Sequence, residues 1–282
     1  MQKKLYTFVP LIAMEVLPEN TSLIVSTYNW KEALSLVLLS VFRQKDLPAE
    51  VIIADDGSRE DTANLIREYQ KKSPIPIHHI WQEDEGFRKS RILNRAICQA
   101  KGSYIIQVDG DIILHPRFIR DHCRFASKGV FLQGSRGMLT PELTRKVQLE
   151  KSTHISFFNP GLKSKENTLR FPLLTRLLLK KHKPKYALYF TKGANVSFWK
   201  SDLIKVNGYN EAFEGWGHED TELALRLLHI GLRKYHLKFS AIAYHQYHPE
   251  DKSKAQEGRN RKLLQEAIDA HSIWAEAGIK QD

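Results

Sequence analysis

The sequence predicts an α/β fold with a doubly wound, mostly parallel sheet, and three observations support this prediction. Short apolar strands alternate with helical patterns over the first 110 residues, which is the spacing of repeated βαβ units. Polar residues follow the first, second and fourth strands, and the carboxyl ends of parallel strands line the edge where ligands bind. The 282 residues can also bury a sizeable core, as one large domain or two small ones.

The expected elements of the first half alternate regularly. After a leader arm over residues 1–20, strands are expected at 22–26, 51–54, 75–81 and 104–108, and helices at 30–43, from 60 onward and at 90–100. The second strand ends in Asp55-Asp56-Gly57-Ser58. This turn leads into an N-capped helix with Glu60 and Asp61 in its first turn.

Beyond residue 125 the pattern is irregular and returns in three places. A strand is expected at 193–198, and a helix is expected to begin near Glu219 and end at Gly231 as its C-cap. A polar helical tail is expected over 251–282. No repeat, low-complexity segment or clear linker divides the chain. We therefore expect one domain over residues 1–282.

Positive charge is concentrated in one segment. The formal net charge is +11, and between Gly134 and Tyr186 there are 12 Lys and Arg against 3 Glu, a local +9. Such a segment suits an anionic membrane surface, an acidic or diphosphate-bearing substrate, or only a solvated basic face. Nucleic acid is not an expected partner, because no nucleic-acid motif accompanies the charge. Within the segment, residues 171–181 form either an amphipathic basic helix at a membrane or a core helix with a lysine end.

Cysteine usage and the first residues of the sequence favour one cellular compartment. No signal-peptide pattern opens the chain, and no apolar run approaches the ~20 residues of a membrane span. Cys98 and Cys123 lack metal-binding spacing and suggest a reducing compartment. The cytoplasm is the expected location, with peripheral attachment to the inner membrane through residues 134–186 as a further hypothesis.

Two carboxylates one residue apart follow the strand at 104–108. Asp109 and Asp111 flank Gly110, which allows a tight turn. Two carboxylates held close together raise each other's pKa unless a cation neutralises them. Mg²⁺ or Mn²⁺ does this through oxygen ligands and can also bridge a diphosphate. Taken alone, the motif fits equally an Asp-Gly turn with two solvated carboxylates.

A second dense stretch runs from residue 208 to 222. Trp216 stands between two glycines, so its indole is expected on a loop, where an aromatic face can serve as a platform for a sugar ring. Glu219 and Asp220 fall in the first turn of the next helix, where the dipole is expected to lower the pKa of a carboxylate and keep it ionised as a base. Acids in a first helical turn are also common without any function. Further along, His245 and His248 offer one imidazole to a metal or lie on a surface loop.

Together these residues resemble family 2 glycosyltransferases of the GT-A fold. The resemblance is to the branch that includes bacterial chondroitin-polymerase domains and, more distantly, to the β-1,4-galactosyltransferases. The matching segments are Val25–Asn29, Asp55–Ser58, Gly86–Arg88 with Asn94, Asp109–Asp111, Gly215–Asp220 and Tyr244–Gln246. They occur in the family's order over about residues 20–250. The resemblance implies a nucleotide-sugar-binding half at 20–125 and an acceptor-binding, catalytic half at 126–250.

The resemblance also implies a role for each matching residue. The expected nucleotide-binding residues are Thr27, Tyr28, Asn29, Asp56, Arg88, Arg91, Asn94 and Asp109. The expected ligands of Mn²⁺ or Mg²⁺ are Asp109, Asp111 and His245, with His248 as the alternative imidazole. Asp220 matches the general base, and the expected acceptor and sugar contacts are Trp216, Gly217, His218 and Glu219. The family's Ala-Arg-Asn is here Ile92-Leu93-Asn94, so the role of its arginine falls to Arg91 or Arg88.

The expected function is an inverting, metal-dependent transfer of a sugar from a UDP-sugar to a hydroxyl of a saccharide or lipid-linked saccharide acceptor, in the synthesis of a surface polysaccharide, capsule or lipopolysaccharide. A metal and an arginine neutralise the departing diphosphate, and a carboxylate deprotonates the acceptor. Related retaining enzymes carry Asn where Asp220 stands, so an acid here favours inversion.

The sequence argues against two other functions. A nucleotide-sugar-binding module without catalysis, acting as a structural partner in a polysaccharide-synthesis complex, should lack one of Asp111, Asp220 or His245, and all three are present. A metal-dependent nucleotidyltransferase should carry a glycine-rich phosphate loop with a lysine near the first strand, and that loop is missing.

Overall fold

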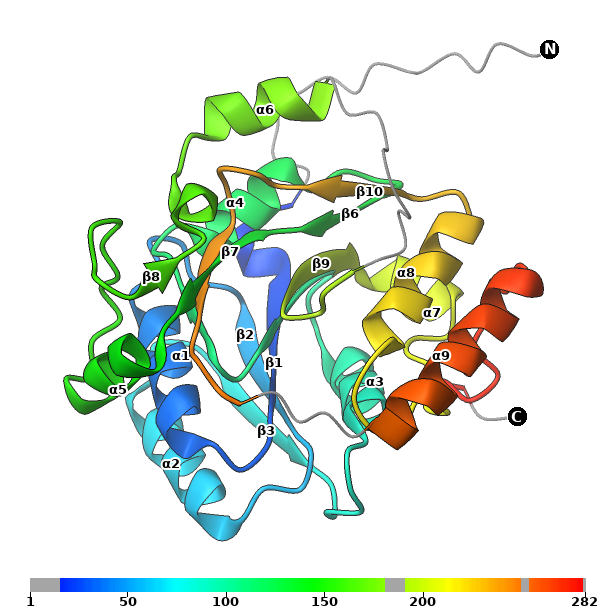
Figure 1. Ribbon diagram of the computed structural model, residues 1–282, viewed down its shortest axis with the longest axis horizontal. Coiled ribbons are helices and arrows are strands. Elements are labelled where there is room, and N and C mark those ends of the chain that lie inside the picture. The colour runs from blue at the N-terminus through cyan, green and yellow to red at the C-terminus, as the bar shows by residue number, and fades with distance from the viewer. Residues whose placement is uncertain (1–15, 181–190, 250–253, 281–282) are drawn as a thin grey trace.

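Two sheets form the frame of the computed structural model, which describes residues 16–180, 191–249 and 254–280 (Figure 1). The large sheet has seven strands, in the order β10 (Arg233–His236), β6 (Val130–Gln133), β9 (Asn195–Trp199), β4 (Tyr104–Asp109), β1 (Thr21–Thr27), β2 (Glu50–Asp55) and β3 (Ile77–Trp81). The small sheet has four, in the order β5 (Ile112–Leu114), β11 (Ile242–His245), β7 (Ser135–Leu139) and β8 (Leu162–Lys163). Most of the expected leader arm lies outside the described residues.

Helices cover both faces of the large sheet, as Figure 1 shows. One face packs against α1 (Lys31–Phe42), α2 (Glu60–Lys72) and α4 (Phe118–Phe125). The other packs against α3 (Lys89–Gln99), α7 (Lys200–Lys205) and α8 (Glu219–His229). Leu23 and Val25 of β1 enter the first core and Ile24 the second, as the alternation of side chains along a strand requires. The predicted doubly wound sheet is confirmed.

The strand order reverses between β1 and β4. β2 and β3 add to one side of β1, whereas β4 adds to the other, and all four strands are parallel. In such sheets a crevice for ligands lies outside the carboxyl ends of the strands at this point. Ser26 near the end of β1 stands in register with Asp109 at the end of β4. β9 runs antiparallel between β4 and β6, so the sheet is mostly parallel.

The first half follows the predicted elements closely, and each expected strand and helix is present with ends within two residues. The expected cap of α2 is wrong, because the N-cap residue is Arg59 and it makes no side-chain cap. The Ser58 hydroxyl instead accepts a hydrogen bond from the Asn29 backbone N–H at 2.8 Å. Ser58 therefore joins the loops after β1 and β2.

The second half contains a small sheet that the sequence pattern did not predict. The segment beyond residue 125 supplies most of this sheet, with α5 (Pro141–Leu149) and a short 3₁₀ turn (Lys165–Thr168). The helix predicted over residues 171–181 is present as α6 (Pro172–Lys180). The predicted helical tail is α9 (Lys254–Asp269), whose Leu264 packs with Phe213 and Leu225 of the α8 region. β11 pairs antiparallel with β5 and so sets His245 opposite Ile112. This pairing brings the end of β11 back to the Asp109–Asp111 turn.

Candidate active site

A group of three side chains at the Asp109–Asp111 turn has the composition of a metal site. The Nε2 atoms of His245 and His248 each lie 3.3 Å from Oδ2 of Asp111, and the three side chains offer ligand atoms within 4.8 Å of one another. Asp111 Oδ1 and His245 Nδ1 are buried and have no hydrogen-bond partner. Buried polar atoms rarely stay unpaired in native structures, so this donor set fits a bound divalent cation.

The small sheet explains why both imidazoles reach the same carboxylate. His245 ends β11, and the next residue, Gln246, donates its backbone N–H to Asp111 O at 3.0 Å. The side-chain amide of Gln246 donates to the same carbonyl at 3.2 Å. The hydrogen bond to Asp111 raises the pKa of His248 to about 9, whereas burial lowers the pKa of His245. The two histidines, predicted as alternatives, are brought together.

Asp109 lies outside this group of three. Its Oδ1 accepts from the Ser26 hydroxyl at 2.9 Å and from Lys89 Nζ at 2.7 Å. Burial would raise the pKa of Asp109, but the charge and hydrogen bond of Lys89 outweigh burial and hold the pKa below its usual value. Its roles in binding the nucleotide and the metal stay predictions.

Lys89 is a site residue that the sequence analysis missed. Lys89 is the first residue of α3, and its side chain is 12% exposed. Burial would lower its pKa, but the negative charges of Asp109, Asp220 and Glu219 raise the pKa well above the usual lysine value. Lys89 stands between the two arginines that were expected to supply the cation. Sequence position alone does not separate three neighbouring cations, so only its burial identifies it.

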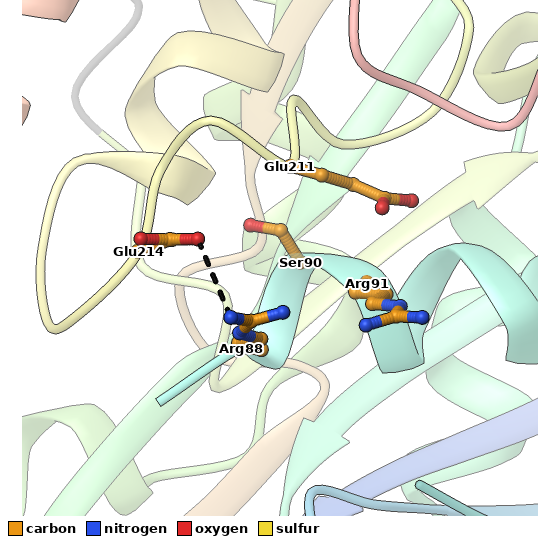
Figure 2. A pocket seen from close by; sticks show the side chains of 5 residues that line it. All are labelled: Arg88, Ser90, Arg91, Glu211 and Glu214. Atoms are coloured by element: carbon orange, nitrogen blue, oxygen red, sulfur yellow. Dashed lines mark ion pairs between the residues drawn. The ribbon is translucent and has the colours of Figure 1, made fainter. Parts of the chain in front are cut away.

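The two predicted arginines, Arg88 and Arg91, line a cleft. Figure 2 shows the cleft, and Arg88, Ser90, Arg91, Glu211 and Glu214 line its volume of about 220 Å³. Arg88 forms an ion pair with Glu85 at 2.7 Å and lies 3.9 Å from Glu214. Arg91 is 3.4 Å from Glu85. The contact of either arginine with a diphosphate stays a prediction.

The loops after β1 and β2 hold the other predicted nucleotide contacts. Thr27 is buried, Tyr28 is half exposed, and Asn29 has a left-handed backbone with φ 47°. The Asn29 side chain accepts from Arg59 N at 2.9 Å, and Thr27 O accepts from Asp56 N at 3.0 Å. Burial raises the pKa of Asp56 to about 6. These contacts join the two loops at one edge of the sheet.

Two asparagines brace the loop before α8. Asn94, a predicted nucleotide contact, is buried, and its amide donates to Tyr209 O and to Glu211 Oε1, both at 2.9 Å. Its observed hydrogen bonds therefore tie α3 to this loop. Asn260 of α9 donates to Gly217 O at 3.0 Å, so the tail supports the loop that carries Trp216.

The acidic pair begins α8, as predicted. His218, with φ 74°, precedes Glu219, and Trp216 is 55% exposed between two glycines with positive φ. The expectation that the helix dipole lowers the pKa of this pair is wrong. Burial and the charge of Asp220 raise the pKa of Glu219 to about 7. Burial also raises the pKa of Asp220, although Lys89 opposes this.

The chain matches two protein-family models and several known proteins. Residues 22–181 match the model of glycosyl transferase family 2, and residues 176–249 match the model described as the N-terminal domain of galactosyltransferase. A hyaluronan synthase of Pasteurella multocida is 28% identical over 86% of this chain, and a chondroitin synthase of Escherichia coli is 25% identical over 90%. The chain spans only 26% and 39% of the lengths of these two relatives.

Solved structures show the same fold. A mannosyltransferase from Pyrobaculum calidifontis, in complex with GDP-Man and Mn²⁺, aligns over 91% of this chain and 65% of its own, with a TM-score of 0.60 and 18% identity. GalNAc-T7 with UDP, GalNAc and Mn²⁺ aligns over 88% of this chain and 47% of its own, with a TM-score of 0.63 and 15% identity. The predicted GT-A fold is confirmed.

Proposed function

Because the chain belongs to glycosyl transferase family 2, we propose that it transfers a sugar, with inversion, from a UDP-sugar to a hydroxyl of a saccharide or lipid-linked saccharide acceptor. The observation that carries this proposal is the presence of two acidic centres. The first is Asp111 with His245 and His248, and the second is Glu219 with Asp220, whose charges act on Lys89 together with that of Asp109. We assign donor binding to residues 20–125 and acceptor binding to residues 126–250.

The proposed chemistry divides between these two centres. Asp111, His245 and His248 would hold Mn²⁺ or Mg²⁺, and the bound ion would supply positive charge to the donor diphosphate. Asp220 accepts the proton of the acceptor hydroxyl. The hydroxyl oxygen then bonds to the anomeric carbon while the bond from that carbon to the diphosphate breaks, and its electron pair leaves with UDP. A single displacement of this kind inverts the anomeric configuration.

A donor screen tests the proposal. Purified protein is incubated with UDP- and GDP-sugars and short saccharide acceptors, and released nucleotide and elongated product are measured with and without chelator. We expect product from a UDP-sugar only, loss of transfer in chelator, and recovery with Mn²⁺. Full transfer in excess chelator would show that sugar transfer does not require a bound metal. Donor binding without transfer would favour the non-catalytic binding module.

We also propose contact with an anionic membrane through α6. The exposed apolar residues on and just before this helix are Phe171, Leu173, Leu174, Leu177 and Leu178. The opposite side is anchored, since the Thr175 hydroxyl contacts Lys238 O at 2.6 Å and Ser240 Oγ at 2.8 Å. An outward apolar face is normally covered, and the nine Lys and Arg against three Glu between residues 134 and 180 favour an anionic surface as the cover.

Vesicle co-sedimentation tests this contact. We expect binding to phosphatidylglycerol vesicles that falls as salt rises through the physiological range, where the Debye length is ~8 Å. Replacing Leu173 and Leu177 together by Gln should reduce binding, whereas Leu149→Gln, an exposed leucine at the end of α5, should not. Equal binding to neutral phosphatidylcholine vesicles would contradict the proposal. Among the described residues, no helix combines the length and apolarity that a bilayer span requires.

A further inference from the structure

Both carboxylate oxygens of Asp220 are hydrogen-bonded by groups from other parts of the chain. The backbone N–H of Gly193 donates to Oδ2 at 2.7 Å, and the Tyr209 hydroxyl lies 3.3 Å from Oδ1. The hydroxyl has one proton, which it shares between Asp220 Oδ1 and the nearer Gln107 Oε1 at 2.9 Å, and Gln107 Nε2 donates to Gly193 O at 3.3 Å. Gly193, Tyr209 and Gln107, which we call the Asp220 clamp, therefore close a ring of hydrogen bonds with Asp220.

The clamp leaves no room for a side chain at residue 193. A Cβ atom built on Gly193 would overlap Asp220 Oδ1, Cγ and Oδ2. Gly193 is not among the glycines with positive φ, so its backbone conformation is open to other residues. The close approach of its backbone to the carboxylate is what requires glycine here.

The surrounding charges explain why Asp220 needs a clamp. Lys89 from α3 attracts its carboxylate, whereas Asp109 from β4 repels it, and Glu219 is its neighbour on α8. Without fixed partners, the carboxylate would turn toward the buried ammonium of Lys89. Tyr209 is 1% exposed, and burial together with the charge of Asp220 keeps its pKa well above the usual tyrosine value. Its hydroxyl therefore remains a donor.

We propose that the Asp220 clamp is a positioning device, in which Tyr209, Gln107 and Gly193 hold the carboxylate away from Lys89 and leave a lone pair free for the acceptor hydroxyl. This inference rests on the proposed role of Asp220 as the base. Each carboxylate oxygen has two acceptor sites, and the clamp uses one on each. Holding a base within hydrogen-bond reach of its proton is a requirement of general base catalysis.

A double-mutant cycle in the intact protein tests the positioning role of Tyr209. Tyr209→Phe should lower kcat about tenfold, the effect of one hydrogen bond, with the affinity for UDP unchanged. In an Asp220→Asn background the same substitution should have no further effect on kcat, because the clamp acts only through this carboxylate. Tyr104→Phe is the matched control, since its buried hydroxyl pairs with Ser197 at 2.8 Å, and it should leave kcat unchanged.

Gly193→Ala supplies an independent test, with Gly258→Ala of α9, where a Cβ meets nothing within 4 Å, as its control. Gly193→Ala should lower kcat by more than Tyr209→Phe and should retain UDP binding. Unchanged kcat in both clamp variants, or equal fold losses from Tyr209→Phe with and without Asp220→Asn, would overturn the clamp. Near wild-type kcat in Asp220→Asn itself would instead overturn the proposed base.

Discussion

The carboxylates of Asp111 and Asp220 are both partly or wholly buried, yet their surroundings are opposite. Asp111 keeps one buried oxygen without a hydrogen-bond partner and has two imidazoles near the other. Asp220 has a hydrogen-bond donor on each oxygen, and its pKa is raised by burial. The first centre leaves a buried oxygen available to a cation, whereas in the second each oxygen has one donor and one further acceptor site. Burial alone therefore does not assign a role to a carboxylate, and its hydrogen-bond partners decide.

The largest expected effect comes from removing the shared ligand of the first centre. Asp111→Asn should abolish Mn²⁺ binding measured by calorimetry and lower transfer by about 10³-fold or more, because several kcal/mol of charge stabilisation depend on the ion. Asp269→Asn, on the exposed side of α9, is the control. Unchanged Mn²⁺ affinity in Asp111→Asn would show that the two centres do not differ as described.

Loss of the base is expected to be the next largest effect. Asp220→Asn keeps the shape of the side chain and should lower kcat by ~10²–10⁴, with Mn²⁺ and UDP affinities unchanged. Glu219→Gln should mainly raise the acceptor KM, because we place this residue on the sugar. Steady-state transfer and calorimetry on both variants give the comparison. If Asp220→Asn keeps its kcat and Glu219→Gln loses it, the base is Glu219.

The two histidines sharpen the description of the first centre. The His245 side chain is 12% exposed and the His248 side chain 42%. His245→Ala should weaken Mn²⁺ binding more than His248→Ala, because the buried ligand is the more preorganised. Mn²⁺ titration of the two variants measures this difference. The reverse order would make His248 the principal imidazole ligand.

The smallest expected effect is a shift in pH dependence on changing Lys89. The charge of Lys89 lowers the pKa of Asp220 and of Glu219, so Lys89→Met should raise both. A base works above its pKa, and the acid limb of the kcat/KM profile should therefore move to higher pH. The loss should be severalfold near pH 6 and smaller near pH 8. Lys89→Arg should keep the wild-type profile. An unchanged acid limb of the kcat/KM profile in Lys89→Met would show that Lys89 does not set the pKa of Asp220 and Glu219.

Local pattern was enough to predict much of this protein. Strand β2 contains four consecutive apolar residues, Val51–Ala54, and β4 contains Tyr104, Ile105, Ile106 and Val108, interrupted by Gln107. This composition predicts that both strands are buried. The helix start at Glu219 follows from the spacing of its leucines. Each of these signals lies within about 15 residues, so local sequence predicts the doubly wound half, the order of its motifs and the family that they resemble.

Contacts between distant segments decided the rest. β11 pairs with β5 across more than 120 residues, and this pairing brings His245 and His248 to Asp111. Packing turned Lys89, rather than its arginine neighbours, toward the acidic centre. It also raised the pKa of Glu219 and Asp220, where the helix dipole alone would lower it. Desolvation and long-range charge depend on what surrounds a residue in three dimensions, and no local pattern of residues encodes that surrounding.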